Sequence, residues 1–291
     1  MKVLVFGASG MVGSAMVRVL SEKKESQVFG TLRNGAAKRF FSPAVASRLI
    51  TGIDVDNHDA MVRVFAQVKP DVIVNCIGLI KQHKDASDPL LAITINALLP
   101  HRMAELCALT GARLVHVSTD CVFAGTKGGY VEDDTADATD IYGKSKFLGE
   151  VNSSHVITLR TSPIGHELES AYGMLEWFLS QELSCKGFSR AIYSGLPSVV
   201  FAQIVRDIVI PQTDLSGLYH IGADPICKYD LLRLIANAYG KSIDIARDDT
   251  VVINRSLDST RFCKMTGYNV PDWPTLIQSM YIARQNNLNH V

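Results

Sequence analysis

The stretch Val3–Gly13, VLVFGASGMVG, joins four apolar residues to a turn that contains three glycines. The following segment, Met11–Ser21, carries apolar residues at helical spacing, so the pattern predicts a strand that leads directly into a helix. At such a junction glycines let backbone N–H groups approach a pyrophosphate, and the helix N-terminus adds partial positive charge. Glycine is also favoured there for its conformational freedom alone, which is the competing interpretation.

Similar apolar runs recur along the first 160 residues, separated by segments with helical periodicity. The predicted strands cover 28–32, 72–75, 113–118 and 156–159, and the predicted helices cover 58–67, 88–109 and 142–152. Alternating strands and helices indicate a parallel sheet, and continuously apolar strands are typical of a sheet buried on both faces. We therefore expect an α/β fold with a doubly wound parallel sheet, the Rossmann architecture.

The pattern changes after Arg160, where Thr161–Gly165 is rich in turn-forming residues. From there to about Gly195 we expect a helix and a loop, then a strand at 217–221 and a helix at 229–239. The predicted dinucleotide-binding domain covers 1–160 plus about 196–222, and a smaller, discontinuous C-terminal substrate lobe covers about 161–195 plus 223–291. No repeat or low-complexity linker separates them, which predicts a shared interface with a cleft.

The composition limits the classes of partner. The 291 residues carry 29 basic and 29 acidic side chains, and 47% are hydrophobic. A disordered chain is excluded, and there is no overall attraction to nucleic acid or anionic lipid. The apolar runs are strand-length, well below the ~20 residues of a membrane helix. We expect a soluble protein that binds neither nucleic acid nor a membrane.

The cysteines and histidines indicate the compartment and the absence of a metal. The six cysteines are widely spaced, at 76, 107, 121, 185, 227 and 263, and the eight histidines are scattered. Neither a disulfide framework nor a metal-binding spacing can be drawn from them. No export signal precedes the first strand. We expect reduced thiols, a cytoplasmic location and no metal site.

The glycine turn and the residue after the second strand predict a dinucleotide cofactor. The turn residues that we assign to it are Gly7, Ser9, Gly10, Met11, Val12 and Gly13. Where a carboxylate would bind the ribose of NADH, the chain has Arg33, which favours the 2′-phosphate of NADPH and leaves NADH as the alternative. A solvated loop arginine is the competing interpretation of Arg33.

Two further segments are candidates for cofactor contacts. Asp54 and Val55 could meet the adenine, although an aspartate in this loop is equally explained as a turn former. Cys76, Ile77 and Gly78 follow a strand at the carboxyl edge of the sheet, where ligands of open α/β folds lie. We therefore expect these last three residues to face the cofactor.

Tyr142 and Lys146 are the strongest catalytic candidates. They lie four residues apart, so they are neighbours on one face of the predicted helix. A phenol with an ordinary pKa near ~10 is a poor acid or base at neutral pH, and a nearby ammonium stabilises its phenolate. Thr119, at the end of the preceding strand, can supply a third hydrogen-bonding group.

Four segments carry a shared pattern: the glycine turn, VSTDCVF at 117–123, YGKSK at 142–146 and NRSLD at 254–258. Together they resemble the extended short-chain dehydrogenase/reductases, and within them the dTDP-4-dehydrorhamnose reductase (RmlD-like) group. The resemblance implies Thr119, Tyr142 and Lys146 as the catalytic trio, and places Lys146, Tyr142, Asn96 and Ser118 at the cofactor. It implies NADPH-dependent reduction of the 4-keto group of a nucleotide-diphospho-deoxysugar, in cell-surface polysaccharide biosynthesis.

Two residues depart from the family pattern at the sugar pocket. Cys121 stands where STDYVF has tyrosine, and Pro163 stands where RTSW has tryptophan. Two smaller side chains enlarge the pocket, so a UDP-linked N-acetyl 4-ketosugar is the predicted alternative to the dTDP-linked rhamnose precursor. The predicted substrate residues are Thr119, Asp120, Cys121, Pro163, Trp177, Tyr193 and Arg255.

Some of these residues have a plain structural interpretation as well. Arg255 suits a diphosphate because a guanidinium can bind two phosphate oxygens, but it is equally a surface arginine beside Asp258. Trp177 and Tyr193 could cover a ring of the substrate, although the apolar residues around Trp177 favour a core helix.

Other activities of the superfamily are weighed against a reductase. A sugar-nucleotide 4,6-dehydratase needs Thr-Asp-Glu, and Cys121 occupies the glutamate position. An epimerase remains open, although Arg33 disfavours the NAD that it retains. RmlD-like chains also resemble a non-catalytic regulatory subunit of methionine adenosyltransferase, but the intact trio favours an enzyme. The predicted partners are a nucleotide-sugar substrate and a second copy of the chain.

Overall fold

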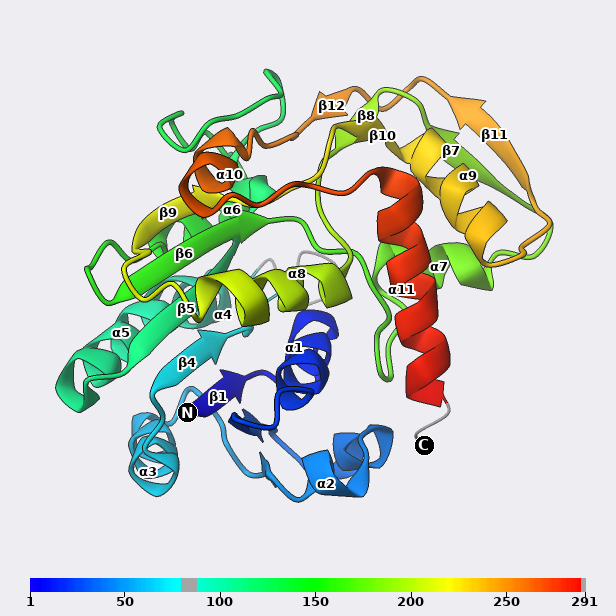
Figure 1. The fold of residues 1–291 in the computed structure, drawn as a ribbon. Coiled ribbons are helices and arrows are strands. Elements are labelled where there is room, and N and C mark those ends of the chain that lie inside the picture. Colours follow the sequence, from blue (N-terminus) through cyan, green and yellow to red (C-terminus); the bar gives the residue numbers. More distant parts are fainter. Residues whose placement is uncertain (80–87, 289–291) are drawn as a thin grey trace.

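The computed structural model describes residues 1–79 and 88–288, and its centre is a parallel sheet with strand order β3-β2-β1-β4-β5-β6-β9 (Figure 1). The strands are β1 (Lys2–Phe6), β2 (Gln27–Thr31), β3 (Leu49–Ile50), β4 (Val72–Asn75), β5 (Arg113–Thr119), β6 (Val156–Thr161) and β9 (Gly217–His220). Every neighbouring pair is parallel, which confirms the predicted doubly wound α/β sheet. The order reverses between β1 and β4, the place where open α/β sheets bind ligands.

Helices cover both faces of the sheet because its strands are apolar on both sides. One core cluster joins the sheet to α1 (Met11–Ser21) and α8 (Ser198–Ile204), and another joins it to α3 (His58–Val68) and α5 (Leu99–Thr110). Successive residues of β1 alternate between the two clusters, as successive strand side chains point to opposite faces. The continuous apolar runs in the sequence reflect this double burial.

The helix before β5 contains a π-helical turn. α4 (Pro89–Ala92), η3 (Ile93–Leu98) and α5 follow one another without a break, and η3 is the π-helical part. Such turns interrupt the regular helix and are frequent at functional sites. α6 (Ile141–Leu148) ends beside it, where a Cβ at Gly149 would lie 1.9 Å from Asn96 O. The predicted helix at 142–152 is therefore too long, because the chain must pass closely under η3.

The C-terminal half adds two small sheets, β10-β8-β12 and β11-β7. Their strands are β7 (Ser184–Phe188), β8 (Ala191–Tyr193), β10 (Ile226–Cys227), β11 (Asp244–Asp248) and β12 (Ile253–Asn254). The helices here are α7 (Met174–Ser180), α9 (Lys228–Ala238), α10 (Thr260–Thr266) and α11 (Trp273–Leu288). The short helical turns of the chain are η1 (Ala36–Phe40), α2 (Pro43–Ala46), η4 (Asp120–Val122) and η5 (Val205–Val209).

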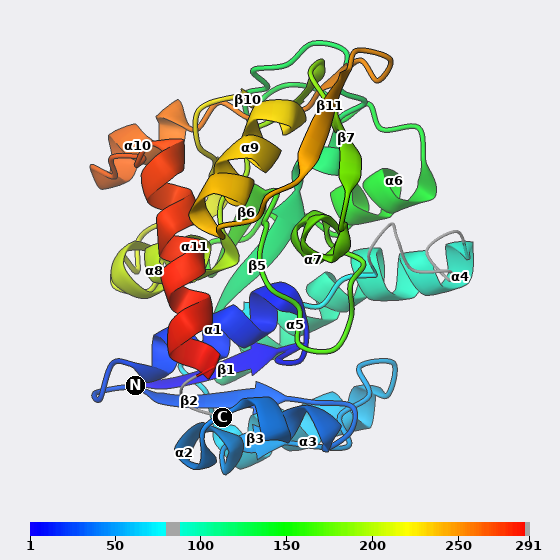
Figure 2. The same ribbon diagram turned by 90° about the vertical axis from the view of Figure 1, so that its right-hand side faces the viewer.

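The small sheets lie at the opposite end of the molecule from β2 and β3 (Figure 2). The expectation of only a helix and a loop before Gly195 is wrong, because β7 and β8 also form there. β9 pairs with β6 in the large sheet, which confirms the predicted strand at 217–221. The division of the chain into two domains stays a prediction. Across residues 1–79 and 88–288, no helix combines the length and apolarity needed to span a membrane.

Candidate active site

The glycine turn lies between β1 and α1. Gly7 has a left-handed backbone with φ of +84°, and its N–H donates to Thr31 Oγ1 at 3.3 Å. A Cβ at Gly13 would lie 2.0 Å from Gly7 O, so only glycine lets α1 pack this closely against the turn. Gly10 precedes α1 without a side-chain cap, and beside it lie Ser9, Met11 and Val12, exposed or half-buried. Helix amides next to such a turn suit a pyrophosphate.

The residues after β4 meet the π-helical turn and α6. A Cβ at Gly78 would lie 3.6 Å from Asn96 Oδ1 and 3.8 Å from Lys146 Nζ. The buried Asn96 accepts from Leu79 N at 2.9 Å and donates to Ser145 Oγ at 3.2 Å. Half-buried Cys76 and Ile77 precede Gly78. The structure thus brings Gly78, Asn96 and Lys146 together at the carboxyl edge of the sheet.

The opposite end of this edge holds the residues predicted for the adenosine half. Arg33 is exposed after β2, and its side chain makes no hydrogen bond or ion pair within the described parts of the chain. Asp54 Oδ1 accepts from Asp56 N at 3.2 Å, the geometry of a turn former, and half-buried Val55 packs on the core. Arg39 is paired with Glu169 at 2.7 Å. Arg33 is therefore the better placed of these two arginines to receive a phosphate.

The catalytic candidates converge at the ends of β5 and α6. Asp140 begins α6 by accepting from Gly143 N at 2.8 Å, which sets the helix that carries Tyr142 and Lys146. The Lys146 ammonium is buried and donates to Val117 O of β5 at 2.8 Å. A side-chain hydrogen bond links Thr119 with the Tyr142 phenol. The three residues predicted from sequence therefore form one cluster.

Burial sets the protonation of this cluster. It lowers the pKa of the Lys146 ammonium to about 8, and the negative charge of Glu150 is the larger of the influences that raise it again. Burial also raises the pKa of the Tyr142 phenol above its ordinary value, and the bond from Thr119 acts in the opposite direction. The phenol is therefore protonated at neutral pH, as a proton donor must be.

Glu150 was not among the predicted site residues. Ser118 Oγ donates to Glu150 Oε1 at 2.7 Å, and Arg160 donates to both carboxylate oxygens, from Nε and Nη2, each at 2.7 Å. Arg160 is 2% exposed, so this ion pair is buried. Two signals were present in the sequence: an arginine within an apolar strand must be paired, and Glu150 follows Lys146 by four residues.

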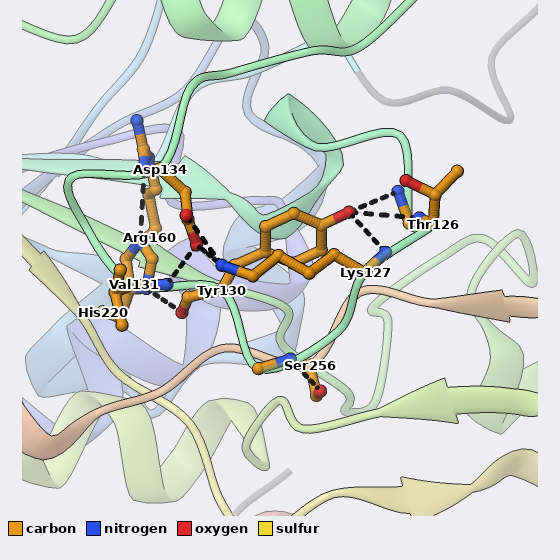
Figure 3. Close-up of polar contacts among 10 residues, drawn as sticks. Thr126, Lys127, Tyr130, Val131, Asp134, Arg160, His220 and Ser256 are labelled. Atoms are coloured by element: carbon orange, nitrogen blue, oxygen red, sulfur yellow. Dashed lines mark hydrogen bonds and ion pairs between the residues drawn. The ribbon is translucent and has the colours of Figure 1, made fainter.

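The network continues to a loop that joins the two halves of the chain (Figure 3). Arg160 Nη1 lies 3.2 Å from His220 Nε2, and His220 Nδ1 lies 3.0 Å from Tyr130 O. The Tyr130 hydroxyl accepts three backbone N–H groups of the loop, at 3.1 to 3.2 Å from Gly125, Thr126 and Lys127. Tyr130 N also donates to Ser256 O at 2.9 Å. The loop therefore ties the segment after β12 to the charged network behind Lys146.

Three of the predicted substrate residues lie next to the trio. Thr119 Oγ1 donates to Asp120 Oδ1 and accepts from Cys121 N, each at 3.1 Å. Arg255 donates to Phe123 O at 2.8 Å and to Ala124 O at 3.4 Å. Burial raises the pKa of the Asp120 carboxyl against the positive charge of Arg255, and burial raises the pKa of Cys121 to about 12. Arg255 is thus fixed beside the reacting end of the site.

The remaining predicted substrate residues divide between core and surface. Tyr193 is buried, its hydroxyl donates to Ser162 O at 2.5 Å, and Asp120 lies near enough to act on its pKa. Half-buried Pro163 follows Ser162. Trp177 is 41% exposed, while Leu175 and Phe178 of the same helix are buried. α7 is therefore a core helix, but Trp177 lies on its outer side.

The structure contains six free cysteines and no metal-ligand cluster in its described parts. All the cysteine side chains are unpaired with one another. Within residues 1–79 and 88–288, no three histidine, cysteine, aspartate or glutamate side chains gather as a metal site would require.

Comparison with known proteins places this geometry in context. The model of the RmlD substrate binding domain family matches residues 1–252. A dTDP-4-dehydrorhamnose reductase of Salmonella typhimurium is 33% identical over 77% of this chain and 73% of its own. The methionine adenosyltransferase 2 subunit beta of Xenopus laevis is 26% identical over 82% of this chain and 72% of its own.

The fold is shared with solved structures. The crystal structure of dTDP-4-dehydrorhamnose reductase from Bacillus anthracis in complex with NADP has a TM-score of 0.78 and 20% identity, and covers 97% of this chain and 99% of that one. This likeness extends to both the large sheet and the C-terminal half.

Proposed function

This chain belongs to the RmlD substrate binding domain family, and we propose that it is an NADPH-dependent reductase of a nucleotide-diphospho-deoxysugar. The observation that carries the proposal is the cluster of Thr119, Tyr142 and Lys146 at the edge of the sheet that also holds the glycine turn. A protonated phenol, a buried ammonium and a hydroxyl at one place suit the reduction of a carbonyl to an alcohol.

Each residue of the trio has a separate role in the proposal. A bound nicotinamide would supply the hydride. The Tyr142 phenol donates the proton to the oxygen of the 4-keto group, and the Lys146 ammonium stabilises the phenolate that remains. Thr119 hydrogen-bonds the same substrate oxygen and orients the phenol. Lys146 also binds the nicotinamide ribose, beside Asn96 and Ser118.

The cofactor assignment rests on the fit of the turn and on a relative. Gly7 and Gly13 let the turn pack closely against α1, and the turn lies in front of the α1 N-terminus, which suits a pyrophosphate. Arg33 is the proposed partner of the 2′-phosphate, and Val55 with Cys76, Ile77 and Gly78 lines the rest. The related Bacillus anthracis structure is described as a complex with NADP. NADH is the weaker alternative.

We propose that the substrate binds on the side of the site formed by the C-terminal half of the chain. Its nucleotide half would lie in the substrate lobe, with Arg255 as the diphosphate contact and Tyr193 behind the sugar. Relatives named for dTDP-4-dehydrorhamnose support a 4-keto-6-deoxyhexose. Cys121 and Pro163 leave more room than the aromatic pattern of the group, so we propose that a UDP-linked N-acetyl 4-ketosugar is preferred over the dTDP-linked rhamnose precursor.

Two alternatives are distinguished from the reductase. The similarity to a methionine adenosyltransferase subunit favours a dinucleotide-binding partner protein, which would need no trio. An epimerase would keep NAD bound through the reaction, and Arg33 opposes this choice of cofactor.

One experiment separates these activities. The protein is mixed with NADPH and a panel of 4-keto nucleotide sugars carrying dTDP, UDP, GDP or CDP, and NADPH oxidation is followed by absorbance. A reductase consumes NADPH with at least one of them. NADPH binding without consumption by any would contradict the proposal and support the partner protein, and interconversion of sugars without NADPH consumption would support the epimerase.

The compartment and the assembly are part of the same proposal. We infer a cytoplasmic location because the six cysteines are free thiols, as a reducing compartment keeps them.

We also infer a homodimer. Leu90 and Ile93, together with Phe147 and Leu148, expose apolar side chains on the adjacent helices α4, η3 and α6. Light scattering of the Leu90→Glu/Phe147→Glu variant should show a monomer where the native protein is a dimer.

A further inference from the structure

Glu150 lies behind the catalytic lysine and touches a residue of the proposed cofactor site. Its Oε1 accepts from Ser118 Oγ at 2.7 Å, and Ser118 is adjacent to Thr119 in β5. Glu150 is also one α-helical turn beyond Lys146, just after the end of α6. The carboxylate therefore sits between the strand that carries Thr119 and the helix that carries Tyr142 and Lys146.

The position of this carboxylate is fixed from the opposite side. Arg160 holds both oxygens in a two-point contact, and its guanidinium lies 5.0 Å from the centre of the Phe123 ring. Its third nitrogen meets His220, which burial keeps neutral by lowering its pKa to about 4. A planar guanidinium held on three sides leaves the carboxylate little freedom to rotate.

Among the described residues, Glu150 supplies the negative charge that acts on Lys146, while its carboxylate is bonded directly to Ser118 and Arg160. Cys76, after β4, is kept as a neutral thiol by burial, which raises its pKa to about 12. His116 of β5 is buried, and burial with the nearby Lys146 and His101 lowers its pKa well below its ordinary value. Neither group carries charge at neutral pH. Within residues 1–79 and 88–288, the ionised group that acts on Lys146 is Glu150.

We propose that Glu150 is a positioning residue: held by Arg160, it fixes the Ser118 hydroxyl at the cofactor and keeps a negative charge opposite the Lys146 ammonium. The inference rests on the proposed function for the role of Lys146 at the nicotinamide ribose. It does not require that the sugar substrate be known. Glu150 itself touches neither reactant.

The test is the pH dependence of NADPH binding, measured by fluorescence without any sugar. Binding weakens as Lys146 loses its proton, so the native transition falls near pH 8, the pKa to which burial lowers this ammonium. In Glu150→Gln the transition should move down by roughly one pH unit, as expected when an opposite charge is removed. The Glu105→Gln variant removes a carboxylate from an exposed site on α5 and should leave the transition in place.

A second pair of variants separates charge from position. Glu150→Asp keeps the charge, but its shorter side chain places the carboxylate farther from Ser118. The transition should therefore stay near that of the native protein, while kcat should fall several-fold. If Glu150→Gln does not fold because Arg160 is left unpaired, Glu150→Gln/Arg160→Met removes both charges and should show a downward transition of smaller size, because the loss of the Arg160 charge acts in the opposite direction.

The outcomes are distinct. A folded Glu150→Gln variant that keeps the native transition overturns the proposal. A shifted transition in a protein that consumes no NADPH with any sugar upholds the positioning role and contradicts the reductase instead. Lys146→Met should abolish the transition, and its persistence there would show that another group is titrating and overturn the assignment.

Discussion

The large sheet and the small sheets are built in different ways. All residues of β4 and β6 are buried, whereas β11 has three exposed residues and a single buried one. Thr119 lies at the end of the buried strand β5, and Lys146 on α6 is held to the same strand by its bond to Val117 O. The small sheets offer two-residue strands, β10 and β12, with Arg255 close behind. The proposed catalytic residues are thus held by buried strands, whereas Arg255 is held by short strands and a loop.

The largest effect should come from the core side of this comparison. Tyr142→Phe keeps the ring and removes the proton donor, so turnover should fall at least ~100-fold while NADPH binding is largely kept. Steady-state rates and NADPH titration measure both. Tyr229→Phe, on α9 in the small half, is the matched control and should be close to native. A turnover rate of Tyr142→Phe near that of the native protein would contradict the proposed mechanism.

The next test lies at the exposed edge of the large sheet. Arg33→Ala removes a charge-assisted contact to the 2′-phosphate, so the NADPH-to-NADH affinity ratio should fall roughly 10- to 100-fold. Calorimetry with both cofactors measures it. Arg63→Ala removes an exposed arginine of α3 and should not alter the ratio. If both variants behave alike, Arg33 is a solvated loop residue.

A smaller effect is expected where the two halves meet. The native protein should prefer a UDP-linked N-acetyl 4-ketosugar, and Cys121→Tyr should move kcat/KM roughly 10-fold toward the dTDP-linked rhamnose precursor by filling the pocket. Competition between the two sugars measures the preference. Cys121→Ser, of similar size, should leave it unchanged. A native preference for the dTDP-linked precursor would contradict the larger pocket and leave the reductase intact.

The smallest effect belongs to the small sheets. Asp248 accepts from Thr250 Oγ1 at 2.5 Å and from Thr250 N at 2.8 Å, and it pairs with Lys186 at 2.9 Å; these contacts lower the pKa of Asp248 to about 2. Its stabilising contribution is present above the ordinary value of 3.8 and is lost as the pH falls through about 2. Asp248→Asn should therefore lower Tm slightly at pH 7 and match the native protein at strongly acidic pH, with kcat unchanged. A Tm difference that persists in acid would point to packing.

The same contrast explains which elements could be predicted. Val3–Phe6 is apolar throughout and Val156–Leu159 is apolar except for Thr158, because these strands are buried on both faces, so both were visible in the sequence. β7 and β11 pair with each other across a long separation, and each has a single buried residue, so their residues carry no apolar pattern. Their pairing is a tertiary event that local sequence does not encode.

The candidate site divides in a similar way. Tyr142, Lys146 and the glycine turn could be found because their chemistry depends on spacing within one helix or one turn. Glu150 and Arg160 meet only because β6 lies beside β5 and α6 ends between them. The place of Arg255 beside Asp120 depends on a loop that folds back from the end of β5. Contacts of this kind become visible only in three dimensions.

The pairing of β6 with β9 has a consequence for how the protein is made. Residues 162–216 lie between these strands and include β7 and β8, whose own partners β10, β11 and β12 come after β9. During synthesis on the ribosome, the backbone edge of β6 that faces away from β5 therefore stays unpaired until β9 has been synthesised. A fragment ending after β6 would keep that apolar edge open and should aggregate, whereas extension through His220 closes it. A circular permutant that begins with β9 would synthesise this strand before β6, so the edge of β6 would be exposed for a shorter time.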